Sequence, residues 1–368
     1  LPIDGNITEY LSDASIGQNA TNVPYGVYYQ NDSITDHFNS YNAYEHLAAA
    51  NFLFEKSFTS SLFVQFGVRY EFQNTFIENN VASYHPKYIS ASKTYYYDFL
   101  PSLNVNYSLT SSSNLRFGAS RTLARPSFRE IAPYAYYDFK EGWRVVGNPE
   151  LERTLINNLD LRYELYLPNN QLISVSAFYK YFINPIELVD DPRANNTEMH
   201  YINIKNSNLW GLEFELRKDL AFVGMKNLYL GGNYSFINSK VQYVEEFGGT
   251  STEVVSRPMY GQSPWVLNLF LSYDNEKAGL SSNIAFNIDG KKLAVVTKGR
   301  TPDVYSMPVS ALNWNISKKF GKIVVKASVG NIINPSYKKT YTYHSKEYIF
   351  QNYKLGRIFG FSIKYLID

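Results

Sequence analysis

Hydrophobic and polar residues alternate one by one along residues 159–181, on both sides of a short turn. Before the turn the apolar positions are Leu159, Leu161, Tyr163 and Leu165, and the residues between them are Asp160, Arg162 and Glu164. After Pro168-Asn169-Asn170 the alternation resumes, with Ile173, Val175, Ala177, Tyr179 and Tyr181 on the apolar side. Successive side chains of a strand point to opposite faces, so this pattern predicts a β-hairpin with one apolar and one polar face.

The same two-residue period recurs along most of the chain. Its apolar positions are Leu62, Val64, Phe66, Val68, Tyr70 and Phe72 upstream, and Trp265, Leu267, Leu269, Leu271, Tyr273, Ile284, Phe286, Ile288, Leu312, Trp314 and Ile316 downstream. The alternate positions carry charges, as at Arg69 and Glu71, which a soluble core would not accept without pairing. An apolar outside and a polar inside are typical of a transmembrane antiparallel β-barrel.

This interpretation assigns a face to each strand residue. We expect the apolar residues Leu161, Val175, Leu269, Phe286 and Trp314 to face lipid. We expect the polar residues Arg162, Glu164, Asn268, Asn287 and Asn315 to face the lumen. A register shift of one residue would exchange the two sets, so an observed register can directly contradict the assignment.

Thirteen strand candidates follow from the pattern. Their ranges are 44–57, 60–78, 94–109, 113–122, 153–167, 170–186, 199–218, 225–244, 262–275, 279–297, 304–319, 322–333 and 350–367. The connections alternate between short turns at 58–59, 110–112, 168–169, 219–224, 276–278 and 320–321 and mostly longer ones at 79–93, 123–152, 187–198, 245–261, 298–303 and 334–349. Outer-membrane barrels place short turns on the periplasmic side and long loops outside. The alternation therefore favours a barrel over a β-sandwich.

The strand count also predicts how the chain is organised. If the last strand runs towards the periplasm, an odd count makes the first strand run the same way, so residues 1–43 are expected to form an extracellular loop region. Residues 44–368 would then be the C-terminal strands and loops of a larger barrel, because bacterial single-chain barrels have an even number of strands.

The amino-acid composition argues against several other classes of protein. The 33 Tyr and 24 Phe suit aromatic girdles at two membrane interfaces. No apolar run approaches the roughly 18 residues of a membrane helix, and the mean hydropathy of −0.30 fits strands whose residues are half polar. The chain has no Cys, which excludes disulfides and thiolate metal sites. A net charge of +2, without a basic stripe or a Gly-rich phosphate loop, gives no reason to expect nucleic-acid binding.

Several motifs point to one family. Residues 121–133 have the sequence RTLARPSFREIAP, followed by VGNPEL at 146–151 and NPIE at 184–187. The sequences EHLAAA and FGVRYE occur at 45–50 and 66–71, and GNIINP and GRIFGFSIKY at 330–335 and 356–365. Together these motifs resemble those of TonB-dependent outer-membrane receptors, in particular the receptors of Bacteroidetes, over nearly the whole chain.

The resemblance implies a plugged barrel of about 22 strands in the bacterial outer membrane. The strands seen here would be the last thirteen, with the plug domain, the N-terminal strands and the TonB-contacting segment outside this sequence. The implied function is active import of a scarce ligand, a small molecule, a glycan or a peptide, driven by TonB. The implied partners are outer-membrane lipid and TonB. Whether a surface lipoprotein is also a partner stays an open question. The alternative is a structural or docking barrel without transport activity.

The longest outer loop, 123–152, holds the candidates for ligand contact. They are Tyr134, Tyr136, Tyr137, Trp143 and Arg144, with Phe139 beside them. Aromatic side chains with Arg give large contact area at low entropic cost, which suits a surface that captures a ligand. A second aromatic group is Tyr337, Tyr341, Tyr343, His344, Tyr348 and Phe350. For both groups the alternative is packing against neighbouring loops or the outer aromatic girdle.

The charged positions of the inner face have a structural interpretation. They are Arg69, Glu71, Arg116, Asp160, Arg162, Glu164, Glu213, Glu215 and Arg217, and we expect them to form ion pairs along the lumen, because buried charges need partners. The alternative is a substrate path. Five scattered His have no metal-ligand spacing, and no Ser, His and acid form a catalytic motif. We therefore expect no cofactor, no metal site and no enzyme activity.

Overall fold

The computed structural model describes residues 41–79, 91–132, 135–139, 141–190, 198–247, 251–297 and 302–367. The expected extracellular loop region at 1–43 therefore lies almost wholly outside the described residues. None of the helices in these ranges has the length and apolar character needed to cross a membrane.

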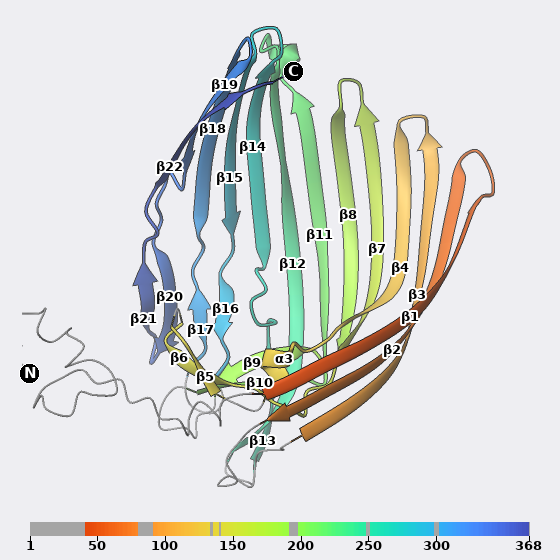
Figure 1. The fold of residues 1–368 in the computed structure, drawn as a ribbon, viewed down its shortest axis with the longest axis vertical. Helices are drawn as coiled ribbons and strands as arrows, with labels where there is room; N and C mark the ends of the chain where they lie inside the picture. Colours follow the sequence, from red (N-terminus) through yellow and green to blue (C-terminus); the bar gives the residue numbers. More distant parts are fainter. Residues whose placement is uncertain are drawn as a thin grey trace, which may run out of the picture.

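One antiparallel sheet of 14 strands forms the body of the molecule (Figure 1). In spatial order its strands are β1 (Tyr41–Ser57), β2 (Leu62–Asn79), β3 (Ala91–Thr110), β4 (Ser113–Ala124), β7 (Thr154–Leu167), β8 (Gln171–Ile183), β11 (Asn206–Asp219), β12 (Leu228–Phe247), β14 (Trp265–Asn275), β15 (Leu280–Asp289), β18 (Ser310–Phe320), β19 (Ile323–Gly330) and β22 (Ile358–Tyr365), with β13 (Ser251–Arg257) paired to the far end of β12. Each neighbour on this path follows the previous one in sequence, apart from the smaller strands between them. All thirteen predicted strands are therefore present in the predicted order.

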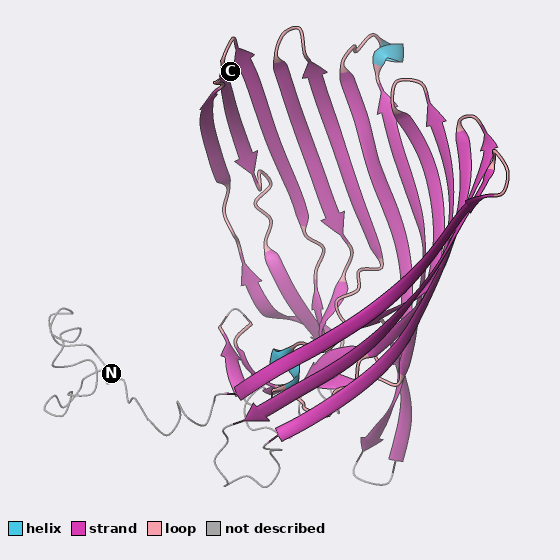
Figure 2. Cartoon of the chain, turned by 45° about the vertical axis from the view of Figure 1, so that its right-hand side comes forward, coloured by secondary structure: helices cyan, strands magenta, loops and turns pink. Residues whose placement is uncertain are grey.

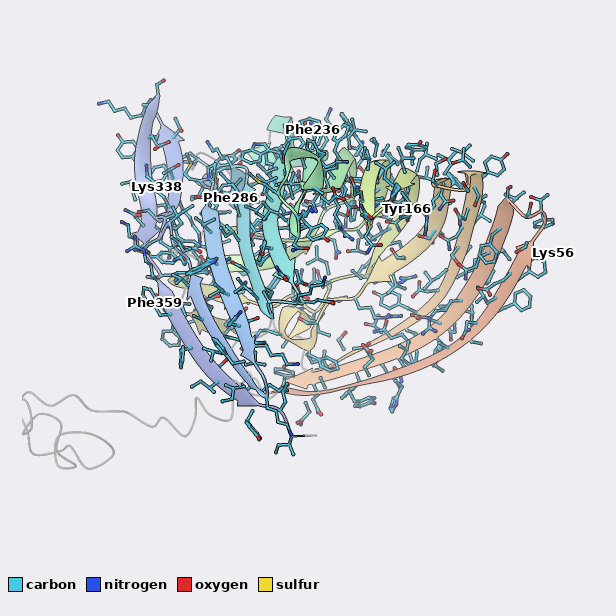
Figure 3. All side chains as sticks on the ribbon, turned by 90° about the horizontal axis from the view of Figure 1, so that it is seen from above. Lys56, Tyr166, Phe236, Phe286, Lys338 and Phe359 are labelled. Atoms are coloured by element: carbon cyan, nitrogen blue, oxygen red, sulfur yellow. The ribbon has the colours of Figure 1, made fainter. Side chains whose placement is uncertain are left out.

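The sheet is a curved, open wall rather than a closed barrel. The strand order starts at β1 and stops at β22, and these two edges do not pair with each other. Viewed from above, Phe236 and Phe359 lie on the convex side of the wall and Tyr166 on the concave side (Figure 3). Large apolar side chains such as Leu161 and Leu269 are exposed, whereas Glu164 and Ser174 are buried.

The strand register confirms the predicted grouping of residues by face. Residues opposite each other in an antiparallel pair point to the same side. Leu161 lies opposite Phe117 and Ala177, and Leu269 lies opposite Phe286. The polar positions line up in the same way, with Asn268 opposite Asn287 and joined to it by a 2.7 Å hydrogen bond.

The two ends of the sheet differ in their connections. One end carries short turns, together with the 3-10 helix η1 (Ala221–Val223) and the C-terminus (Figure 1). At the β7–β8 turn, Asn169 and Asn170 have φ angles of 61° and 58°, the left-handed conformation that Asn tolerates in tight turns. The other end carries the long connections (Figure 2), and we call it the outer end.

The long connections at the outer end have secondary structure of their own. One small sheet has the order β5 (Ala135–Asp138), β6 (Trp143–Val146), β10 (Glu198–Asn203), β9 (Ile186–Asp190), beside the short helix α3 (Phe128–Ile131). A second has the order β16 (Lys292–Val295), β17 (Val304–Ser306), β20 (Tyr337–Tyr343), β21 (Lys346–Tyr353). A parallel bridge between Val189 and Val296 joins the two sheets. The described parts of the predicted loops 123–152, 187–198 and 334–349 thus belong to one folded layer.

Four predicted strands are each divided into two by a break between the wall and this layer. The prediction of one strand over 199–218 is wrong, since Ile204 and Lys205 separate β10 from β11. The Asn203 amide donates to the backbone oxygens of Glu152 and Asn184, at 3.0 and 2.8 Å, and such side-chain bonds compete with the ladder.

Proline and glycine account for the other three breaks. The predicted strand 304–319 divides into β17 and β18 at Pro308, which has no N–H to donate to a ladder. The predicted strand 350–367 divides into β21 and β22 around Gly356, at a φ of 83°. The strand predicted over 279–297 likewise divides into β15 and β16 around Gly290, whose backbone lies against Trp265 and Pro264.

Candidate ligand-binding site at the outer end

A hydrophobic core holds the outer-end layer together. Its buried members come from both small sheets: Trp143, Val145, Met199, Val295 and Val304. Tyr136, Leu188, Tyr201 and Tyr341 pack against them and are only partly buried. The layer is therefore a packed unit with an interior of its own.

Trp143 joins the two aromatic groups that the sequence placed in separate loops. Its ring is 4% exposed and lies 6.2 Å from the ring of Phe350, centroid to centroid. The ammonium of Lys339 lies 5.5 Å from the Trp143 ring and forms an ion pair with Glu141. The candidate Trp143 is thus a packing residue in this conformation, and its contact with a ligand stays a prediction.

Tyr136 is half-buried and belongs to a stack at the edge of this core. The guanidinium of Arg129 lies 4.3 Å from its ring, and its hydroxyl lies 3.4 Å from the hydroxyl of Tyr201. Burial raises the pKa of the Tyr201 hydroxyl, and the hydrogen bond with Tyr136 raises it further. The Tyr201 hydroxyl therefore acts as a neutral donor and acceptor at ordinary pH.

Other candidates in the 123–152 loop present open surface. Tyr137 is 53% and Phe139 is 89% exposed, and their rings meet edge to face at 5.2 Å. Arg144 is exposed and pairs with Glu198 at 3.4 Å. Tyr134 lies outside the described residues. A bare aromatic pair beside a cation is the kind of surface that could bind a ligand.

The second aromatic group lies on the β20–β21 hairpin. Tyr341 stacks on Tyr348 with 5.4 Å between centroids, and Tyr343 meets His344 edge to face at 4.2 Å. The turn uses His344 and Ser345 at φ angles of 45° and 63°, which fits a two-residue hairpin turn. Tyr343, Tyr348 and Phe350 are exposed. The hairpin thus buries one part of its aromatic surface and presents the rest.

A buried ion pair that the sequence analysis missed fixes the layer to the wall. Glu187 of β9 and Arg257 of β13 lie 2.5 Å apart, and both side chains are almost completely buried. Nothing in the sequence reveals this pair, because neither residue belongs to a motif that places it beside the other.

Arg125 connects the longest loop to the inner wall. Its guanidinium donates to Glu71 and, at 2.5 Å, to Gln73, and Glu71 also accepts a 2.5 Å bond from Arg69. Arg153 at the far end of the same loop pairs with Asp98 at 2.6 Å. The loop that holds the candidate aromatic residues is therefore tied to the wall near both of its ends.

Ion pairs run across the inner wall below this layer, as predicted. Glu164 accepts from Arg116 at 2.9 Å and from Arg162 at 2.8 Å, and Arg162 also reaches Glu215 at 2.7 Å. Arg217 lies 4.0 Å from Glu215. Within the described part of the chain, the predicted positions Asp160 and Glu213 form no ion pair. Seven of the nine predicted charges therefore belong to such pairs.

Metal ions in proteins are held by groups of His, Cys, Asp and Glu side chains. In the ranges that the structure describes, no group of three or more His, Asp or Glu could hold a metal ion.

Comparison with known proteins gives the fold a context. No curated protein matches the sequence. Among solved structures, a mutant of the ferric enterobactin receptor PfeA from Pseudomonas aeruginosa, in complex with enterobactin, is similar at a TM-score of 0.56 and 14% identity, over 88% of this chain and 54% of that one. The ferric yersiniabactin uptake receptor FyuA from Yersinia pestis is similar at a TM-score of 0.61 and 14% identity, over 88% and 46%.

The copper transporter OprC is similar at a TM-score of 0.61 and 13% identity, over 88% of this chain and 48% of that one. The chain thus spans about half the length of these solved structures. At these identities the similarity shows the fold alone. A family model matches residues 5–365, nearly the whole chain, and the chain belongs to the outer membrane protein beta-barrel family.

Proposed function

We propose that this chain is part of a TonB-dependent importer of the bacterial outer membrane. The observation that carries the proposal is the combination of a charge-lined inner wall with an ordered, aromatic-rich layer at the outer end. The structural neighbours named as receptors, uptake receptors and transporters support it. A barrel that only anchors or docks would not need the exposed aromatic pair Tyr137 and Phe139 in this layer.

Ligand capture would take place at the outer-end layer. Tyr137 and Phe139 offer two aromatic faces, and Arg144, which is exposed, offers a cation within the same layer. Because Arg125 and Arg153 tie the loop to the wall, a ligand bound there would lie directly above the lumen. Ordered loops also reduce the entropy lost on binding.

Translocation would follow the route implied by the family resemblance. TonB, driven by the proton gradient of the inner membrane, would remodel a plug within the lumen. The paired charges of the wall, such as Arg162 with Glu164 and Glu215, would give that plug a polar surface to slide against without exposing an unpaired charge. A small molecule, a glycan and a peptide all fit this scheme, and a surface lipoprotein would be a further partner.

An uptake experiment tests the proposal. Cells that express the intact protein are given a panel of labelled ligands: a ferric siderophore, a cobalamin, an oligosaccharide and a peptide. We expect one class to accumulate, and we expect accumulation to stop when the proton gradient is collapsed. The double variant Tyr137→Ala/Phe139→Ala should reduce uptake, whereas Tyr166→Phe, which changes only an inner-wall hydroxyl bonded to Glu164, should not. Binding without energy-dependent accumulation would instead indicate a docking barrel.

A further inference from the structure

A groove crosses the convex, lipid-facing side of the wall. It has a volume of about 370 Å³ and lies between strands β4 and β11. Its lining side chains on this face are Phe117, Leu159, Leu161, Ala177, Tyr179 and Trp210. The groove therefore lies on the side of the sheet away from the lumen and from the outer-end site.

The groove exists because Ala177 is short. Its neighbours across the ladder are Leu161 and Leu212, and the next outward residue on its own strand is Tyr179. Trp210 stands over Phe236 with 5.7 Å between ring centroids, which closes one side. Because Ala177 has only a methyl group among large side chains, the groove is an apolar gap that a hydrocarbon chain can fill.

Two basic side chains, those of Arg121 and Lys240, flank the groove on its outer-end side. Arg121, Asn157, Tyr181, Asn208 and Lys240 form one row across five neighbouring strands, by register, on this same face. Arg121 donates one hydrogen bond to Asn157 at 2.9 Å, which uses one of the five N–H donors of its guanidinium. Lys240 is exposed, and no described residue bonds to its ammonium.

Strand geometry places this row at the outer edge of the apolar band. Along β7, Asn157 is ten residues from Leu167, about 33 Å at the usual rise of a strand. At the tilt typical of such barrels this corresponds to about 25 Å of height, which is the height of the band itself. Asn157 therefore lies at the outer edge of the apolar band, and Arg121 and Lys240 lie in the same row, about 19 Å apart at four strand spacings.

We propose that the groove and the two cations form a binding site for lipid A, the phosphate-bearing glycolipid of the outer leaflet. One acyl chain lies over Ala177 beside Trp210, and the phosphates lie near Arg121 and Lys240. The separation of the two cations suits a wide headgroup with more than one phosphate, and their positive charge favours an anionic lipid over a zwitterionic one. The site is independent of the imported ligand and rests only on the location in the outer membrane.

Native mass spectrometry of the intact protein in detergent tests the proposal. The probes are purified diphosphoryl lipid A and phosphatidylethanolamine. We expect one bound lipid A per protein, and at least tenfold weaker binding after Arg121→Gln/Lys240→Ala. Ala177→Leu should give a similar loss, because the added carbons fill the groove. Uptake of the imported ligand should not change in any of these variants.

Matched variants on the same face are the controls. Lys318→Ala removes an outward cation at the short-turn end, where Lys318 donates to the Ala278 carbonyl, and Ala327→Leu adds the same side chain on β19. Both should bind lipid A as the wild type does. The proposal is overturned if phosphatidylethanolamine binds equally well, or if a correctly folded groove variant or cation variant keeps full affinity. The cation variants alter only surface groups, so they decide the matter even if Ala177→Leu folds poorly.

Discussion

Glu187 and Arg257 form a buried ion pair although 70 positions separate them in the chain. Their side chains are 3% and 5% exposed, and Arg257 also donates to the Pro258 carbonyl at 3.1 Å. The backbone N–H of Tyr260 donates to Glu187 at 3.2 Å. The carboxylate therefore joins strand β9 of the outer-end layer to the segment that follows β13.

Removing one partner of this pair should destabilise the protein strongly. We predict that Glu187→Ala lowers the free energy of unfolding by about 3–5 kcal/mol, because the buried guanidinium of Arg257 would lose the carboxylate with which it forms an ion pair. A urea titration of the protein in lipid measures the change.

The pair between Arg144 and Glu198 provides the control. Its atoms are 3.4 Å apart and Arg144 is exposed, so Arg144→Ala should cost about 1 kcal/mol or less. Similar costs for the two variants would show that Glu187 is not buried as described.

The assignment of faces gives a second prediction. Leu269 is 41% exposed on the convex face, opposite Gly232, whereas Asn268 lies on the inner face and donates to Asn233 at 2.7 Å. Leu269→Arg should cost about 2–4 kcal/mol, because it places a charge in hydrocarbon near the bilayer midplane. Asn268→Arg should cost far less, because it faces water. Equal costs in a folding titration in lipid would contradict the assigned faces.

Within the outer-end site, two variants distinguish a residue that packs in the core from a residue that is a candidate for ligand contact. Trp143→Ala should lower the free energy of unfolding by about 3–5 kcal/mol, because it leaves a cavity in the core beside Phe350 and Met199. Phe139→Ala should change it by about 0.5 kcal/mol or less, since the side chain is 89% exposed. If Phe139 contacts the ligand, its variant loses affinity at unchanged stability. An unchanged affinity for every ligand that the protein imports would remove Phe139 from the site.

The sequence predicted the wall well, because one physical constraint acts on every strand. Lipid on one side and water on the other impose a period of two, so residues such as Leu161 and Arg162 reveal their faces without any knowledge of their neighbours. The order of strands followed from the short turns, as at Asn169-Asn170.

The outer-end layer could not be predicted in the same way. Its strands are as short as the three residues of β17, and their residues are buried by contacts between segments far apart in sequence, as between Trp143 and Phe350. No lipid imposes a period on them. The sequence could therefore identify aromatic groups in two loops, but not that they meet, nor which of them, like Trp143, is buried.

The edges of the sheet lead to the last prediction. In the described structure β1 pairs only with β2, and β22 only with β19, so each edge leaves a row of N–H and C=O groups without partners. Every such group costs several kcal/mol in hydrocarbon, so a sheet in a membrane must close or be covered. We predict that residues 1–368 expressed alone do not insert as a stable monomeric barrel. Co-expression with a polypeptide that supplies the remaining strands should restore a folded species.

Gel mobility measures this outcome, because a folded barrel migrates differently before and after heating. We expect no heat-modifiable band from residues 1–368 alone, and we expect such a band, resistant to protease, when the covering strands are present. A double variant that places Pro at Gly360 and Phe361 should abolish rescue, because the N–H groups of successive strand residues point to opposite sides, so β22 would lose one donor to β19 and one donor to a new neighbour. If residues 1–368 alone give a closed, detergent-stable barrel, β1 and β22 must pair with each other, and the open wall would not be the form that exists in the membrane.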